Sequence, residues 1–181
     1  MKYINKFNIK IINLLVKSIM ETINAIYFYN LRNEFAYMSN FFPTFFSDNN
    51  GNTFNCSEQY FMYHKCLTFD KDNSVLLNNI LSNKSPTKIK AFGRQVKNFD
   101  ENIWCKIRYN IMLDGLRLKF SQNSIINNKL KATNDKMLYE ASKYDKIWGI
   151  GYSGCDAISI HPSKYGQNLL GKALMEIRNE M

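Results

Sequence analysis

The chain has 181 residues, of which 45% are hydrophobic, and a formal net charge of +9. This length fits a single domain whose core needs neither metal nor disulfide support. No stretch approaches the roughly 20 apolar residues of a membrane span. The basic residues are scattered and form no Arg-rich stripe, which argues against a nucleic-acid-binding protein. The charge stays compatible with a basic pocket for one or two phosphate groups.

The sequence carries no recognisable metal-binding pattern. It has no Cys-x-x-Cys pair, and its two histidines do not complete a zinc spacing. We therefore expect no metal and no cofactor. The cysteine usage favours an intracellular, cytoplasmic protein with four reduced thiols, at Cys56, Cys66, Cys105 and Cys155.

Residues 1–22 are expected to form an N-terminal extension to one domain over residues 23–181. Apolar residues between Ile4 and Leu15 follow helical spacing, with lysines between them. Lys10 interrupts the apolar run and no small-residue cleavage site follows, which argues against a secretory signal. A poorly ordered surface extension, a translation start at Met20 and a membrane-surface helix are the alternatives for this segment.

The first half of the domain is predicted to begin with a strand at residues 25–29, because the sequence there is a short apolar and aromatic run. A turn at residues 48–51 separates two short extended segments around Phe45 and Thr53. Ser57 is the predicted N-cap of a helix that reaches about Thr68.

Three further helix starts follow. Asp72 is expected to cap a helix through Leu81, and Ser85-Pro86 is a strong start signal for the next helix. Asp100 is expected to cap the longest helix, whose apolar line is Ile103, Ile107 and Ile111. Gly115 would cost this helix about 1 kcal/mol relative to Ala, so it marks a bend or a close packing point.

The last third is predicted to hold a short helix at residues 125–131 and a strand at residues 137–141. A mostly irregular segment over residues 149–165 and a closing helix at residues 168–178 complete the pattern. The fold class is therefore α+β, a mainly helical single domain with a few short strands.

Glu58 and Lys65 are the first candidate chemical groups. On a helix they share a face, with Lys65 about 10 Å further along the axis. A carboxylate and an amine that face one pocket form an acid/base pair, or provide an amine that attacks a sugar carbonyl. The alternative is an exposed glutamate favoured by the helix dipole and a solvated lysine.

The segment Asp145-Lys146-Ile147-Trp148-Gly149-Ile150-Gly151 is the second candidate. A carboxylate, a tryptophan and glycines in this order suit a place where the backbone approaches a ligand closely. Asp145 as a turn cap and Trp148 as a core residue are the alternatives.

Trp104 and Arg108 lie one helical turn apart and share a face. A tryptophan can stack on a planar base, and an arginine can hold a phosphate group; a core tryptophan is the alternative. Asn40 with Phe41, and Asn168, are candidates for contacts with ribose hydroxyls or a base edge.

The order of these motifs resembles the NADAR family of N-glycosidases, also called YbiA-like. The resemblance runs from about Tyr27 to Arg178 and includes Ser39-Asn40-Phe41, Glu58-Gln59-Tyr60-Phe61 with Lys65, and Trp104 with Arg108. Lys119-Phe120, Asp145 to Gly151 and Gly166-Gln167-Asn168-Leu169-Leu170-Gly171 complete it. Met62 and Tyr63 differ from many members, which carry Gln and Ala there.

The resemblance implies hydrolysis of a ribosyl C–N bond in a small phosphorylated substrate, without a cofactor. One branch of the family acts on early ribosylamino-pyrimidine phosphates of riboflavin biosynthesis and releases ribose 5-phosphate. Another removes ADP-ribose from guanine, and a non-catalytic ADP-ribose-binding module is the third possibility.

The resemblance also suggests roles for the candidate residues. Glu58 would be the main acid/base, Lys65 the amine nucleophile or electrostatic partner, and Asp145 the second carboxylate or a ribose ligand. The expected substrate-binding residues are Asn40, Phe41, Trp104, Arg108, Trp148, Gly149 and Asn168.

Overall fold

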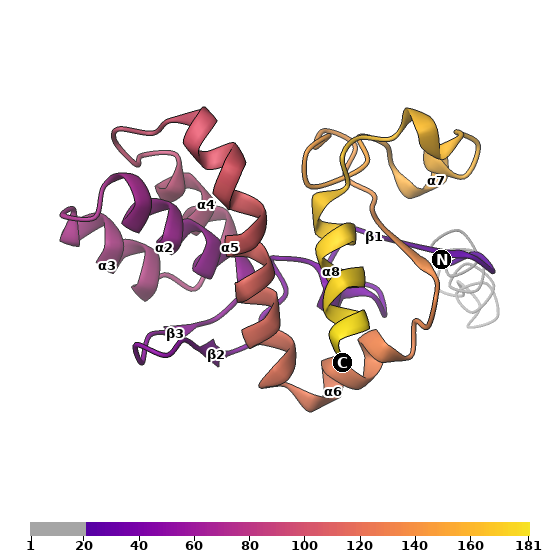
Figure 1. Cartoon of the computed structure of the whole chain (residues 1–181), viewed down its shortest axis with the longest axis horizontal. Helices are drawn as coiled ribbons and strands as arrows, with labels where there is room; N and C mark the ends of the chain where they lie inside the picture. Colours follow the sequence, from indigo (N-terminus) through magenta and orange to yellow (C-terminus); the bar gives the residue numbers. More distant parts are fainter. Residues whose placement is uncertain (1–20) are drawn as a thin grey trace, which may run out of the picture.

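The structure is a computed structural model that describes residues 21–181, and it confirms a mainly helical α+β domain with few short strands (Figure 1). The expectations for residues 1–19 lie outside the described residues. The helices are η1 (Ala36–Met38), α2 (Ser57–Phe69), α3 (Ser74–Ser82), α4 (Pro86–Gly93), α5 (Glu101–Ser121), α6 (Ser124–Lys131), α7 (Gly154–Ala157), η2 (Pro162–Lys164) and α8 (Leu169–Glu180). The strands are β1 (Ala25–Phe28), β2 (Phe46–Ser47), β3 (Thr53–Phe54) and β4 (Met137–Glu140).

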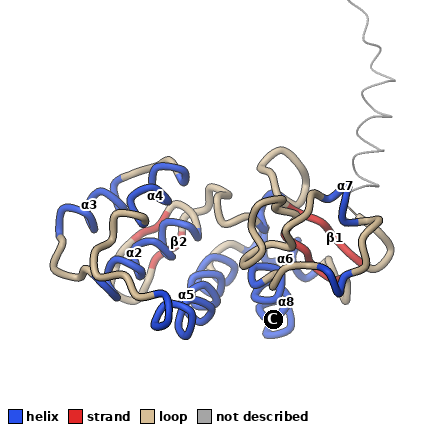
Figure 2. The backbone as a smooth tube through the Cα atoms, turned by 90° about the horizontal axis from the view of Figure 1, so that it is seen from above, coloured by secondary structure: helices blue, strands red, loops and turns tan. Residues whose placement is uncertain are grey.

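Helices α5 and α8 adjoin in the middle of the molecule. Helix α2 packs against α3, α4 and α5 on one side, and α8 packs against α5 and β4 on the other. Seen from above, α2, α3 and α4 form one half, while β1 and α7 belong to the other half (Figure 2). Any site between the halves therefore takes residues from segments far apart in the sequence.

Strands β1 and β4 form a parallel pair, with Ala25 opposite Met137 and Phe28 opposite Glu140. All four residues of β1 are buried, as expected for a strand covered on both faces. Helices η1 and α2 to α6 lie between these two strands in the sequence. The pairing thus brings the end of β4 beside the segment that follows β1.

The predicted turn at residues 48–51 joins β2 to β3 in a short antiparallel pair. The Asp48 carboxylate accepts hydrogen bonds from the N–H groups of Asn50 and Asn52, each at 2.9 Å. Gly51 has a φ of 83°, a conformation that glycine adopts without a steric penalty.

Two helices begin one residue away from the predicted caps. The N-cap of α2 is Cys56, and Ser57 is already helical. The backbone carbonyl of Asn40 accepts the Glu58 N–H at 3.0 Å, so tertiary structure satisfies a donor of the first turn. The N-cap of α3 is Asn73 rather than Asp72, because the Asn73 side chain accepts the Leu76 N–H. Ser85 and Asp100 occupy the predicted N-cap positions, and the Asp100 side chain accepts the N–H groups of Asn102 and Ile103.

The buried face of α5 differs from the predicted isoleucine line. Ile103 is 47% exposed, whereas Trp104, Arg108, Met112 and Leu116 are buried. The helix packs on both α2 and α8, so its central face turns inward and the isoleucines lie at the edge.

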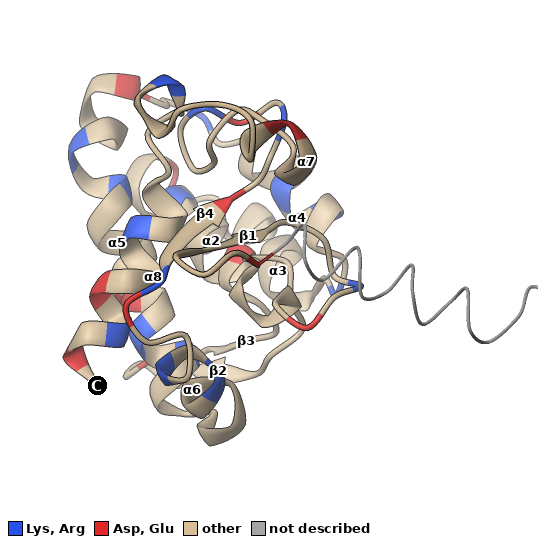
Figure 3. Ribbon diagram, turned by 90° about the vertical axis from the view of Figure 1, so that its right-hand side faces the viewer, with Lys and Arg blue, Asp and Glu red and all other residues tan. Residues whose placement is uncertain are grey.

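Basic and acidic residues are interspersed on α5 and α8 (Figure 3). Arg117 on α5, for example, donates to both oxygens of Glu180 on α8, at 2.8 and 2.6 Å. This arrangement agrees with the scattered charge of the sequence. No helix among residues 21–181 is long and apolar enough to cross a membrane.

Candidate active site

A cavity of about 390 Å³ lies where the two halves meet. Segments from both halves line it: the chain after β1, the residues before β2, the first turns of α2, one residue of α4, and the end of β4 with the loop that follows. Five of the ten predicted site residues are in this lining, namely Asn40, Phe41, Glu58, Asp145 and Trp148.

Glu58 lies in the first turn of α2 and is only 5% exposed. Burial raises the pKa of its carboxyl to about 7, and the nearby Asp145 carboxylate acts in the same direction. The Lys90 and Arg94 cations oppose this rise by favouring the ionised form. A carboxyl that titrates near neutral pH can both donate and accept a proton.

Glu140 is a second cavity carboxyl, which the sequence interpretation did not identify. It ends β4, and burial together with Asp145 raises its pKa to about 8. Its Oε2 is buried and has no hydrogen-bond partner among the described residues. A buried acceptor without a partner is costly, so this atom is suited to contact a ligand. The only sequence signal was an acidic residue inside the predicted strand at 137–141.

Lys90 is the lysine of the cavity lining. Its Nζ lies 5.8 Å from the centroid of the Phe41 ring. The charge of Lys90 acts on both glutamates, because it favours the ionised form of Glu58 and of Glu140. The cavity thus combines carboxyl groups with one amine.

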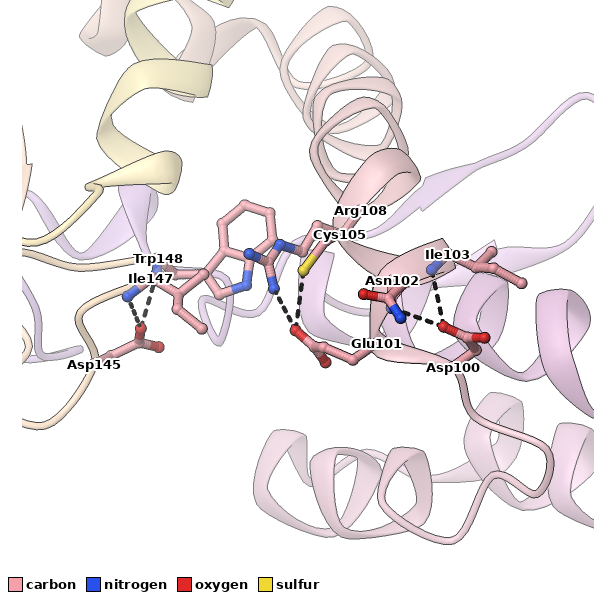
Figure 4. A network of polar contacts seen from close by, with 9 residues as sticks. All are labelled: Asp100, Glu101, Asn102, Ile103, Cys105, Arg108, Asp145, Ile147 and Trp148. Carbon is pink, nitrogen blue, oxygen red and sulfur yellow. Dashed lines mark hydrogen bonds and ion pairs between the residues drawn. The ribbon is translucent and has the colours of Figure 1, made fainter.

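Asp145 and Trp148 are held in a tight turn. The Oδ1 of Asp145 accepts the N–H groups of Ile147 and Trp148, both at 2.8 Å (Figure 4). The Trp148 ring meets Phe61 at 5.1 Å between centroids in an edge-to-face contact. Asp145 is therefore both a turn cap and a cavity residue.

Asn40 and Phe41 enter the cavity from the loop that precedes β2. Asn40 is 9% exposed, and its side-chain Oδ1 has no hydrogen-bond partner among residues 21–181. The Asn40 Oδ1 is therefore an acceptor for hydroxyl or amine groups of a ligand, and the Glu140 Oε2 is a second polar atom without a partner.

The structure does not bring Lys65 to Glu58. The Lys65 Nζ lies 4.0 Å from the centroid of the Phe99 ring, and Lys65 is absent from the cavity lining. Burial lowers its pKa. The two residues share a helix face, but almost two turns separate them, and the lysine stem turns to Phe99 instead of reaching back.

Trp104 and Arg108 share a face of α5 as predicted, but that face is packed in the core. The Trp104 ring meets Phe61 and Phe69 at 4.9 and 6.1 Å between centroids. Arg108 is 8% exposed and donates to Glu101 at 3.1 Å (Figure 4). Neither residue is in the cavity lining.

Gly149 and Asn168 lie outside the cavity lining and contact the backbone of β4. A Cβ at Gly149 would lie 2.8 Å from the carbonyl oxygen of Glu140, so the close approach predicted for this glycine is to the protein's own backbone. Asn168 is 5% exposed, and its side chain bonds the backbone of Leu138 and Glu140. Both residues fix the end of β4.

The remaining lining residues were not among the predicted site residues, although Ser39 and Phe61 belong to motifs that carry the family resemblance. These lining residues are Tyr29, Asn30, Leu31, Ser39, Phe61, Met62 and Ser142. Within residues 21–181, no group of three or more His, Cys, Asp and Glu side chains is arranged to hold a metal ion. The described site therefore offers acid/base groups, one amine and unsatisfied acceptors.

Comparisons with known proteins identify the family of this chain. The family model described as the NADAR domain matches residues 27–181. An N-glycosidase of Acanthamoeba polyphaga mimivirus is 40% identical over 169 residues, which cover 89% of this chain and 98% of that protein. A Vibrio vulnificus riboflavin biosynthesis protein is 29% identical over 91% of this chain, but only 40% of its own length is covered.

The fold is also known from a solved structure. The NMR structure of the E. coli protein YbiA has a TM-score of 0.71 and 28% sequence identity to this chain, and the match covers 88% of this chain and 86% of YbiA. The extent of the family match and the shared fold leave one conclusion. The chain belongs to the NADAR domain family.

Proposed function

We propose that this protein is an N-glycosidase that hydrolyses the ribosyl C–N bond of ribosylamino-pyrimidine 5′-phosphates and releases ribose 5-phosphate. The observation that carries the proposal is the placement of Glu58 and Glu140, two carboxyls whose pKa values burial raises, in one cavity with Lys90. The cavity volume of about 390 Å³ fits a ligand of this size. The relatives' names supply the reaction class and the riboflavin connection.

Glu140 is the proposed proton donor. With a pKa of about 8 it is protonated at neutral pH, and a leaving nitrogen needs a proton as the C–N bond breaks. The proton of Glu140 moves to that nitrogen, and the bonding electrons leave with the base.

Glu58 and Asp145 act on the sugar side. Bond cleavage builds positive charge on the ribosyl group, and nearby carboxylates lower the energy of that state. Glu58, with a pKa of about 7, is the carboxyl that loses its proton first. Its carboxylate accepts a proton from the water that adds to the sugar, while backbone N–H groups orient Asp145.

Lys90 is the proposed partner of the substrate phosphate, because it is the lysine of the cavity lining and an ammonium group binds phosphate as a point charge. Lys65 remains the candidate for the amine nucleophile or electrostatic partner that the family resemblance implies. In the structure its Nζ lies over Phe99, so this role requires the side chain to turn toward the cavity.

The test is to incubate the purified protein with freshly made ribosylamino-pyrimidine phosphates and to quantify free ribose 5-phosphate. Glu58→Gln and Glu140→Gln keep the shape of each side chain and are expected to lower turnover at least about 100-fold. Val75→Ser, at a site 70% exposed on α3, is the matched control and should keep full activity.

Two other outcomes would redirect the proposal. Turnover of ADP-ribosylated guanine, with none of the pyrimidine substrates, would assign the protein to the second branch of the family. Saturable binding of ADP-ribose without any product would make the cavity a binding module, and the acid/base roles would be wrong.

A further inference from the structure

Lys119 on α5 is a fully buried lysine that the proposed reaction does not use. Its exposed fraction is 0%, and its Nζ donates to the backbone carbonyls of Tyr37 at 2.8 Å and Ser39 at 3.1 Å. The rings of Phe42 and Phe120 lie 5.8 and 5.4 Å from the same atom. Within the described residues, no carboxylate forms an ion pair with this amine.

The Tyr37 carbonyl belongs to η1, and the Ser39 carbonyl begins the loop that enters the cavity. The Ser39 carbonyl also accepts the Phe42 N–H at 3.2 Å, and the Ser39 hydroxyl accepts the Phe41 N–H at 3.2 Å. Between these bonds lies Asn40, whose own carbonyl accepts the Glu58 N–H at 3.0 Å. Ser39 is therefore bonded to Lys119 of α5, and the next residue along the chain, Asn40, is bonded to the first turn of α2.

Burial of this amine has a cost. Removing an ammonium group from water without a carboxylate partner is unfavourable, and burial lowers the pKa of Lys119 to about 7. A methionine of similar length would fill the same space without that cost. A role in geometry accounts for this lysine better than a role in stability.

We propose that Lys119 is a positioning residue of the active site. By holding the carbonyls of Tyr37 and Ser39, it fixes the loop that presents Asn40 and Phe41 to the substrate and keeps the Asn40 carbonyl on the Glu58 backbone. The inference about substrate rests on the proposed function, whereas the inference about the loop does not.

The experiment compares Lys119→Met with Leu116→Met in the full chain. Leu116 is fully buried on the same helix, one turn earlier, so its substitution alters core packing without touching the loop bonds. Three quantities are measured for each variant: the melting temperature, amide hydrogen exchange of residues 39–42, and binding of ribose 5-phosphate by isothermal titration calorimetry.

We expect Lys119→Met to exchange the amides of residues 39–42 at least about tenfold faster, and to bind ribose 5-phosphate at least about tenfold more weakly. Leu116→Met should match the wild type in exchange and in binding. If Lys119→Met keeps wild-type exchange and binding, the proposal is wrong. Equal losses in both variants would also overturn it, because they would reflect core packing.

Two further arms keep the result decisive. If Lys119→Met does not fold, Lys119→Gln takes its place; a drop in melting temperature with unchanged exchange in residues 39–42 would then overturn the positioning role. If the wild type itself does not bind ribose 5-phosphate, amide exchange alone decides the role of Lys119, and the proposed function is decided separately by the turnover assay.

Discussion

Asn168 holds the backbone of Glu140 in place at the back of the cavity. Its side-chain Oδ1 accepts the Glu140 N–H at 3.0 Å, and its Nδ2 donates to the Leu138 carbonyl at 2.8 Å. Asn168 is also the N-cap of α8, with a left-handed φ of 52°. One side chain thus links the start of the last helix to the strand that carries the candidate proton donor.

Asn168→Gly should destabilise the protein by about 1–3 kcal/mol, because it leaves two buried backbone groups without partners. Asn168→Ala should cost about 1 kcal/mol more, since a Cβ disfavours the left-handed conformation. Urea unfolding of both variants measures the two effects separately. Equal stabilities for the Gly and Ala variants would show that the backbone conformation contributes nothing.

The sequence located the parts of the site that depend on local structure. Glu58 was predicted at a helix start, and Asp145 with Trp148 in a segment that approaches a ligand, and all three line the cavity. Glu140 and Lys90 were not found, because they reach the cavity through the pairing of β4 with β1 and the packing of α4 on α2. Such contacts between distant segments leave no local pattern.

Shared helix faces were the weaker guide. Trp104 and Arg108 do lie on one face, but whether a face meets a ligand or the core depends on which helices pack against it. For Lys65, the helix fixes the position of the backbone, while the direction of a long flexible stem depends on neighbours such as Phe99. The fold class and most helix starts were predictable, since caps and apolar runs are local signals.

Glu140→Gln should stabilise the protein increasingly as the pH rises. Folding raises the pKa of Glu140 from 4.5 to about 8, so the folded state holds a proton that the unfolded state releases above pH 4.5. The stability of the wild type from this group is complete below pH 4.5 and is lost as the pH rises to about 8. Glutamine imitates the neutral acid and does not titrate.

Urea unfolding at pH 5.5 and pH 8.5 tests this expectation. A pKa unit corresponds to about 1.4 kcal/mol, so the advantage of Glu140→Gln over the wild type should grow by at least about 2 kcal/mol between the two pH values. Glu58→Gln should change in the same direction by less, because the pKa of Glu58 is about 7. A constant difference across this pH range would contradict the buried, protonated state of Glu140.

Lys90→Gln and Lys65→Gln discriminate between the two lysines. If Lys90, the lysine in the cavity lining, binds the substrate phosphate, Lys90→Gln should raise the KM for the phosphorylated substrate at least about tenfold, the equivalent of about 1.4 kcal/mol. Lys65→Gln should then change kcat and KM less than about threefold. Steady-state kinetics on both variants gives the answer, and a loss of kcat confined to Lys65→Gln would support the amine role inferred from the family resemblance.

Gly115→Ala sets two effects against each other. In an exposed helix, alanine in place of glycine would stabilise by about 1 kcal/mol. Here a Cβ at position 115 would lie 2.6 Å from the Cδ1 of the Tyr60 ring, which confirms the predicted close packing point. Tyr60 is 7% exposed and packs on Phe54 at 5.1 Å between ring centroids, so the ring has little room to move.

We therefore expect overpacking to win, with a net destabilisation of about 1–3 kcal/mol. The double variant Gly115→Ala with Tyr60→Leu checks the cause: removing the ring should relieve the clash, so the alanine should cost less in the Tyr60→Leu background than in the wild type. Chemical unfolding of the four proteins completes the cycle. An alanine that stabilises the wild-type background would mean that α2 and α5 can separate slightly at no cost, and the contact would then not limit their distance.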